Sequence, residues 1–248
     1  VNDWYDTIKL NYCDTHTETW EKMYDIVSFW AEQGVDGFRC DMVELVPPEF
    51  FRWLISKVKK DRPELIFIAE VYQKALYAKY IREVGFDLLY DKSGMYDVLR
   101  AIVEKNVNDS GVPVEDWQSA KRITWNWQSL GDLQPYMLNF LENHDEQRFA
   151  SDFFGQKAEN SFAALYASLF FNQAPFMLYA GEEVGERGMD NEGFSGTDGR
   201  TTIFDWWAPS ASTRLYKFIH GETEALAPRE RKVLERYRTA LTCATSDN

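Results

Sequence analysis

The chain has 248 residues, 45% of them hydrophobic, which is enough to bury the core of one large α/β domain. Its 40 acidic and 27 basic side chains give a formal net charge of −13, which disfavours nucleic acid and anionic membranes as partners and suits a neutral substrate. No apolar run reaches membrane-spanning length, so no membrane insertion is expected.

Helix-like and strand-like segments alternate along the chain. Apolar residues at helical spacing predict a first helix over 20–31. Residues 35–41 (VDGFRCD) predict a strand, and the Pro-Pro pair at 47–48 suits the start of a second helix. Residues 65–71 (LIFIAEV) are apolar nearly throughout, which is typical of a parallel strand covered on both faces.

The rest of the chain repeats this alternation. Three further strands are predicted within 85–91 (GFDLLYD), 135–148 (PYMLNFLENHDEQR) and 174–183 (APFMLYAGEE). Helices are predicted from Phe162 onward and within 211–221 and 229–243, with a long charged loop at 184–200. The repeated β–α pattern predicts an α/β fold, either a parallel sheet or part of a (β/α) barrel.

Arg39 and Asp41 are charged residues in an otherwise apolar strand. Burying an unpaired charge is costly, and two residues apart on a strand they share one face. Cys40, between them, is expected to face the other way as a small core residue. The pair fits a structural ion pair at a strand end and a shared functional site equally well.

Polar side chains recur at the predicted C-terminal ends of the strands, the edge that holds the site in parallel α/β proteins. They are Asp41, Glu70, His144 with Asp145, and Glu182. Arg39 favours the ionised Asp41 that a nucleophile needs, whereas Glu70 closes an apolar strand, where burial favours the protonated form of a general acid. Asp145 is a candidate third carboxylate, with His144 as a hydrogen-bond donor to substrate.

Structural interpretations stand beside these. Glu70 also fits a helix cap or a surface position past its strand, and His144-Asp145 alone fits an ordinary turn better than a site. Arg148 is more typical of a structural salt bridge, and Glu182 of loop structure. Four tryptophans could stack on sugars but individually fit packing better: Trp125, Trp127, Trp206 and Trp207.

Several motifs resemble the α-amylase family (glycoside hydrolase family 13). GFRCD, IAEVY and FLENHD are similar, in order and spacing, to the motifs after that family's strands four, five and seven. APFMLYAGEEVG resembles its eighth-strand motif, DWYDTIKLNY the stretch before its fourth strand, and DGRTTIFDWW its loop after strand eight. The resemblance implies an incomplete (β/α)8 TIM barrel: residues 1–248 would be a single catalytic domain, the C-terminal part of the barrel, without the N-terminal strands and the C-terminal β-sandwich.

The resemblance also implies retaining cleavage of α-glucosidic bonds in starch-derived glucans or malto-oligosaccharides, through a covalent glycosyl-enzyme. Asp41 would be the nucleophile, and Glu70 the acid and then the base. Asp145 would stabilise the oxocarbenium-like transition state. Arg39 would orient and ionise Asp41, and His144 would bind sugar hydroxyls.

Two departures from the family pattern carry expectations of their own. The family's Asp…Asn-His motif near strand three is missing, so we expect the C-terminal half of a catalytic barrel or a truncated product. Alone it would be weakly active or inactive, with an unpaired strand at 35–41. Many amylases carry Lys-His three and four residues after the nucleophile, where Glu44 and Leu45 stand here. That change argues against endo-acting starch cleavage and does not support calcium binding, so no metal or other cofactor is predicted.

Three functions compete. The first is an α-glucan hydrolase or transglycosylase, and the second a non-catalytic amylase-like carbohydrate-binding protein, against which the intact carboxylates argue. The third is an unrelated metal-dependent barrel enzyme. Arg39 argues against it, because its cation would compete with the metal ion for Asp41. Loops at 72–80, 121–136 and 184–200 are expected to set linkage and chain-length preference, while localisation and oligomeric state are not predicted.

Overall fold

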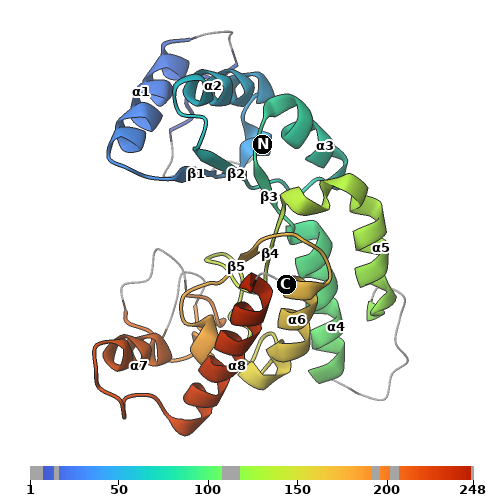
Figure 1. The fold of residues 1–248 in the computed structure, drawn as a ribbon, viewed down its shortest axis with the longest axis vertical. Coiled ribbons are helices and arrows are strands. Elements are labelled where there is room, and N and C mark those ends of the chain that lie inside the picture. The colour runs from blue at the N-terminus through green and yellow to red at the C-terminus, as the bar shows by residue number, and fades with distance from the viewer. Residues whose placement is uncertain (1–7, 14–16, 108–117, 192–195, 202–206, 247–248) are drawn as a thin grey trace. The chain divides into compact units, whose positions relative to one another are not determined.

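The structure, a computed structural model, describes residues 8–13, 17–107, 118–191, 196–201 and 207–246. The chain forms two compact units, Val1–Tyr90 and Asp91–Asn248, which are described separately below. Each alternates strands with helices (Figure 1), and its strands pair in parallel, which confirms the predicted α/β class. The assignment of residues 1–248 to one catalytic domain stays a prediction.

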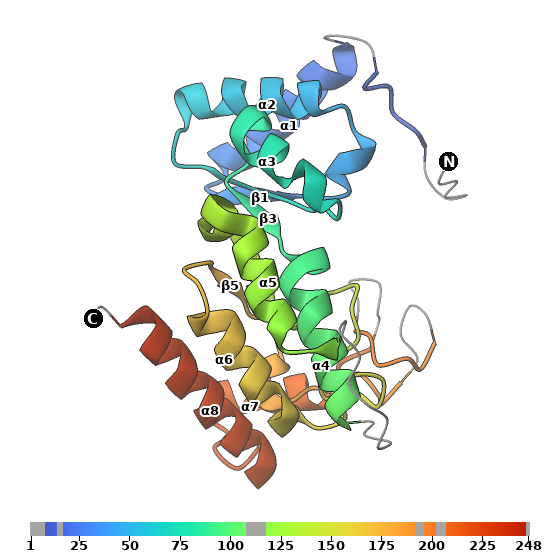
Figure 2. The ribbon, with the colours of Figure 1, turned by 90° about the vertical axis from the view of Figure 1, so that its right-hand side faces the viewer.

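The first unit contains a parallel three-stranded sheet with helices packed beside it. Its elements are α1 (Glu18–Glu32), β1 (Gly37–Cys40), α2 (Pro48–Asp61), β2 (Ile66–Ala69), α3 (Tyr77–Lys79), a π-helical turn (Tyr80–Val84) and β3 (Leu88–Tyr90). The strand expected to be unpaired at 35–41 pairs with β2 on one side and with no other strand among the described residues. Helices α1 and α2 lie side by side (Figures 1 and 2). The strands predicted up to residue 91 are confirmed, each shorter than expected.

The apolar stripe of α2 forms much of this unit's core. Phe51, Leu54 and Ile55 are buried, and the ring of Phe51 lies 5.2 Å from that of Phe86, just before β3. At the start of β1, a Cβ on Gly37 would overlap the carbonyl oxygen of Ile66, so the close approach of β1 to β2 requires glycine there.

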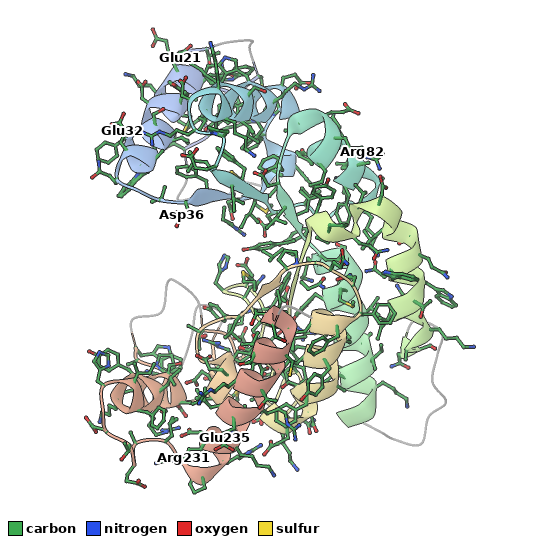
Figure 3. All side chains as sticks on the ribbon, in the orientation of Figure 1. Glu21, Glu32, Asp36, Arg82, Arg231 and Glu235 are labelled. Carbon is green, nitrogen blue, oxygen red and sulfur yellow. The ribbon has the colours of Figure 1, made fainter. Side chains whose placement is uncertain are left out.

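The second unit holds a parallel strand pair and five α-helices within its described residues. The elements are α4 (Asp97–Val107), α5 (Lys121–Leu130), β4 (Met137–Phe140), α6 (Phe162–Phe170), β5 (Phe176–Met177), α7 (Ser210–Ile219) and α8 (Pro228–Thr245). Helices α6 and α8 lie side by side (Figures 1 and 2), and Figure 3 shows Arg231 and Glu235 on α8. No described helix has the length and apolar character needed to cross a membrane.

Helix α5 corrects the sequence analysis, which expected a loop over residues 121–136. Residues 123, 127 and 130 are Ile, Trp and Leu, a spacing of four and three that is helical. Two tryptophans and an Ile-Thr pair, all typical of strands, obscured that period. Helix α4 was also missed, and most of the expected loop at 72–80 is helical, from the 3-10 turn Lys74–Leu76 into α3.

Candidate active site

Arg39 contacts both predicted catalytic carboxylates of the first unit. Asp41 directly follows β1 and Glu70 directly follows β2, at the edge where the two strands end in register. Nη1 of Arg39 donates to Oδ1 of Asp41, and Nη2 of Arg39 lies 3.2 Å from Oε2 of Glu70. The prediction that Arg39 and Asp41 share one face of the strand is confirmed.

The two carboxylates lie in different environments. The Asp41 side chain is 70% exposed and that of Glu70 only 4% exposed. Burial lowers the pKa of Arg39, but the hydrogen bond to Asp41 and the charge of Glu70 raise it by more, so the guanidinium stays cationic. Burial raises the pKa of the Cys40 thiol to about 12, which fits a core residue and not a reactive thiolate.

Both oxygens of Glu70 are held by further hydrogen bonds. The hydroxyl of Tyr72 donates to Oε1, and the backbone N–H of Met42 donates to Oε2 at 2.9 Å. Met42 has φ 45° and ψ 43°, a left-handed conformation that costs a residue other than glycine about 1–2 kcal/mol. The strained backbone next to Asp41 directs this N–H at Glu70, and such strain clusters at functional sites.

Tyr72 and Met42 are contacts that the sequence analysis missed. Tyr72 lies two residues after Glu70, so the spacing argument that paired Arg39 with Asp41 could have found it. Met42 contributes its backbone N–H, for which the identity of the side chain gives no signal.

The motif residues of the second unit lie in a tight loop after β4. The side-chain oxygen of Asn143 accepts the backbone N–H groups of Asp145 at 2.9 Å and Glu146 at 3.0 Å. Nε2 of His144 lies 3.2 Å from Oδ2 of Asp145, and Arg200 donates to the backbone oxygen of Asp145 at 2.7 Å. The structure therefore brings His144 together with Asp145.

The predicted site residues thus fall into two groups. Arg39, Asp41 and Glu70 meet in the first unit, and His144 and Asp145 meet in the second. Of the tryptophans considered for sugar stacking, Trp125 and Trp127 lie half-exposed on α5, Trp207 is partly buried, and Trp206 lies outside the described residues.

A buried ion pair joins the two ends of the His144–Asp145 loop. Glu142 accepts Nη1 of Arg148 and the backbone N–H of Phe149, each at 2.8 Å, and the two charged side chains are 1% and 4% exposed. The predicted structural salt bridge of Arg148 is confirmed. Its partner Glu142 was missed, because an acidic residue in the loop after a strand gives no sign of burial.

Glu182 is a second buried carboxylate of this unit. It accepts the hydroxyl of Tyr237 at 2.9 Å and is 2% exposed. Burial raises the pKa of Glu182 well above its ordinary value of 4.5, and the neighbouring Glu142 raises it further. Arg148 donates a hydrogen bond directly to Glu142, whereas Glu182 accepts from the hydroxyl of Tyr237, so we assign the proton of the pair to Glu182.

The protonated Glu182 predicts a pH dependence of stability. Between its ordinary value of 4.5 and the raised folded value, the folded state binds more protons than the unfolded state, so the free energy of unfolding falls as the pH rises. Glu182→Gln should remove this contribution and make the protein relatively more stable above pH 5 than at pH 4. Urea unfolding at several pH values checks this, with the exposed Glu222→Gln as the control; parallel pH curves for both variants would contradict it.

The described ranges contain no group of three His, Cys, Asp or Glu side chains arranged as metal ligands. Glu44, three residues after Asp41, uses both carboxylate oxygens to accept backbone N–H groups. Because its two oxygens accept these N–H groups, Glu44 fits a hydrogen-bonded link between loops better than a cation ligand. That the protein binds no metal stays a prediction.

Comparison with known proteins decides the family. The family model of the alpha amylase catalytic domain matches residues 5–206. The chain belongs to the alpha-amylase family. The parallel strands and helices of the described residues match part of a (β/α)8 TIM-type barrel, so the chain has an incomplete barrel of this type, as predicted.

Among curated members of the alpha-amylase family, the maltose-1-phosphate maltosyltransferase of Corynebacterium glutamicum is 33% identical over 85 residues, 34% of this chain and 13% of that protein. Neopullulanase 2 of Thermoactinomyces vulgaris is 25% identical over 171 residues, 69% of this chain and 28% of that protein. The chain thus spans less than a third of the length of these relatives.

Solved structures show the same fold. Cyclic alpha-maltosyl-(1→6)-maltose hydrolase from Arthrobacter globiformis, in complex with maltose, matches with a TM-score of 0.62 at 20% identity, over 94% of this chain and 46% of that chain. An alpha-amylase from H. orenii matches with a TM-score of 0.62 at 20% identity, over 95% of this chain and 50% of that chain.

Proposed function

We propose that this chain carries catalytic residues of a retaining glycoside hydrolase that cleaves α-glucosidic bonds in malto-oligosaccharides or starch-derived glucans. The observation that carries the proposal is the contact of one guanidinium, Arg39, with both Asp41 and Glu70. Such a bridge favours the carboxylate separation of about 5–5.5 Å found in retaining enzymes over the roughly 6.5–9.5 Å of inverting ones.

The two environments divide the chemical roles. Exposed Asp41, which is paired with Arg39, attacks the anomeric carbon while enclosed Glu70 donates its proton to the glycosidic oxygen, and the bond between that carbon and that oxygen breaks. The sugar is then held as an ester on Asp41. Glu70, now ionised, takes a proton from water, whose oxygen attacks the anomeric carbon and releases Asp41.

His144 and Asp145 enter the proposal through the FLENHD motif alone. Asp145 would stabilise the oxocarbenium-like transition state, and His144 would hold sugar hydroxyls. The substrate class follows from the names of relatives, which include a neopullulanase and a maltose-1-phosphate maltosyltransferase. No step runs through a metal ion, and no nucleic acid or membrane partner is proposed.

Transfer to another sugar is the second candidate function. The maltosyltransferases are 33% and 36% identical to this chain in their matched regions, against 25% for the neopullulanase. In that reaction the hydroxyl of an acceptor sugar replaces water, and Glu70 again takes the proton.

The test uses the longest natural form of the protein that contains this chain. Malto-oligosaccharides are incubated with and without maltose 1-phosphate, products are separated by chromatography, and the first-formed anomer is read by proton NMR, with Asp41→Asn as the control. Cleavage with retention of the α-configuration is expected, and glucan elongation from maltose 1-phosphate would assign transfer. Inversion, or glucan binding without cleavage or transfer, would overturn the proposal.

A further inference from the structure

A carboxylate that the proposed reaction does not use links the loops that follow β1 and β2. Glu44 lies three residues after Asp41. Its Oε2 accepts the backbone N–H of Tyr72 at 3.0 Å, and its Oε1 accepts that of Gln73 at 3.1 Å. Tyr72 and Gln73 are the second and third residues after Glu70. The side chain of Glu44 therefore holds the segment that follows the proposed general acid.

The link runs in both directions. The backbone N–H of Met42, from the loop of Asp41, donates to Glu70 at 2.9 Å, and Glu44 from the same loop accepts from the loop of Glu70. Tyr72 takes part in both halves, since its N–H binds Glu44 and its hydroxyl binds Oε1 of Glu70. Hydrogen bonds to a carboxylate are about twice as strong as neutral ones.

We propose that Glu44 is a positioning residue that fixes the geometry between Asp41 and Glu70, by holding Tyr72 where its hydroxyl meets Glu70. The inference rests on the proposed function, because the position of Glu44 matters for catalysis only if Asp41 and Glu70 act on the same substrate. Each oxygen of Glu44 accepts a backbone N–H group of the loop after Glu70, so Glu44 braces this loop.

The brace has a kinetic consequence that a sugar contact would not have. A displacement of about 1 Å of a catalytic group can cost on the order of 10²-fold in rate without affecting binding. Loss of Glu44 should therefore lower kcat and leave KM nearly unchanged. The hydroxyl of Tyr72 contacts Oε1 of Glu70, so its removal should likewise lower kcat and leave KM nearly unchanged.

Four variants test the inference: Glu44→Ala, Glu44→Gln, Tyr72→Phe and, as the control, Glu64→Ala. Glu64 is exposed, lies just before β2 and carries the same charge. Glu44→Ala should lower kcat on malto-oligosaccharides about 10–100-fold with KM within about twofold. Glu44→Gln keeps one acceptor oxygen but turns an amide NH2 towards the other backbone N–H, so it should recover part of that loss. Glu64→Ala should match the parent.

Amide hydrogen exchange gives a readout that needs no activity. The N–H groups of Tyr72 and Gln73 should exchange faster in Glu44→Ala and unchanged in Glu64→Ala. If the parent cleaves nothing while this exchange difference appears, the proposed function fails and the brace stands. Unchanged exchange in Glu44→Ala, or the same loss of kcat in Glu44→Gln as in Glu44→Ala, overturns the inference. Should Glu44→Ala fail to fold, Tyr72→Phe takes its place: a lower kcat with KM nearly unchanged is expected, and kinetics like the parent's overturn the inference.

Discussion

Glu70→Gln is expected to lower kcat on malto-oligosaccharides by about 10²–10⁴-fold, the usual size of a general acid–base contribution. The amide keeps the acceptor for the N–H of Met42 but has no proton to give to a sugar leaving group. An α-glycosyl fluoride needs no such proton, so its first step should be far less affected. Steady-state kinetics on both substrates measure the difference.

Azide sharpens this test because it attacks the ester on Asp41 without a base. Added azide should restore turnover of the fluoride by Glu70→Gln and give a glycosyl azide of retained configuration. The matched control is Glu64→Gln, an exposed carboxylate of the same unit, which should behave like the parent. Equal losses on both substrates, with no effect of azide, would remove Glu70 from the role of acid and base.

Arg148→Met is expected to lower the free energy of unfolding by about 3–5 kcal/mol, because it leaves the Glu142 carboxylate buried without its cation. Met keeps much of the volume of the side chain, so packing changes little. Urea unfolding followed by circular dichroism measures the loss.

Two controls separate the buried charge from other effects. Arg229→Met breaks an exposed pair with Glu159 in the same unit and should cost only about 0–1 kcal/mol. Adding Glu142→Gln to Arg148→Met should recover part of the loss, because the amide is neutral and still accepts the N–H of Phe149. If Arg148→Met costs no more than Arg229→Met, the pair does not hold the loop of His144 and Asp145.

Local spacing was enough to find the core of the first-unit site. Arg39 and Asp41 are two residues apart, and Asp41 and Glu70 each follow the end of a strand. The sequence therefore predicted that these residues share one edge of the sheet, and the structure places them at that edge. The same local reasoning failed for α5, where strand-forming residues obscured a helical period. The five strands were found because each combines an apolar run with a polar end.

What the sequence could not show is contact between distant segments. Glu44 meets Tyr72 and Gln73 across 28 and 29 residues of chain, and the left-handed backbone of Met42 has no signature in its side chain. Glu142 and Glu182 look like surface acids until their burial and the neighbouring Arg148 and Tyr237 are seen. Such contacts depend on tertiary packing, which local periodicity does not encode.

The central claim is that Asp41 forms a covalent bond to the sugar. The most direct measurement is to incubate the longest natural form of the protein with a fluorinated, slowly released α-glycosyl fluoride and to read intact mass and peptide maps. The account predicts one added glycosyl group, on the peptide that contains Asp41, and none in Asp41→Asn. An adduct on another residue, or cleavage of malto-oligosaccharides by the Asp41→Asn protein at the parent's rate, would contradict it.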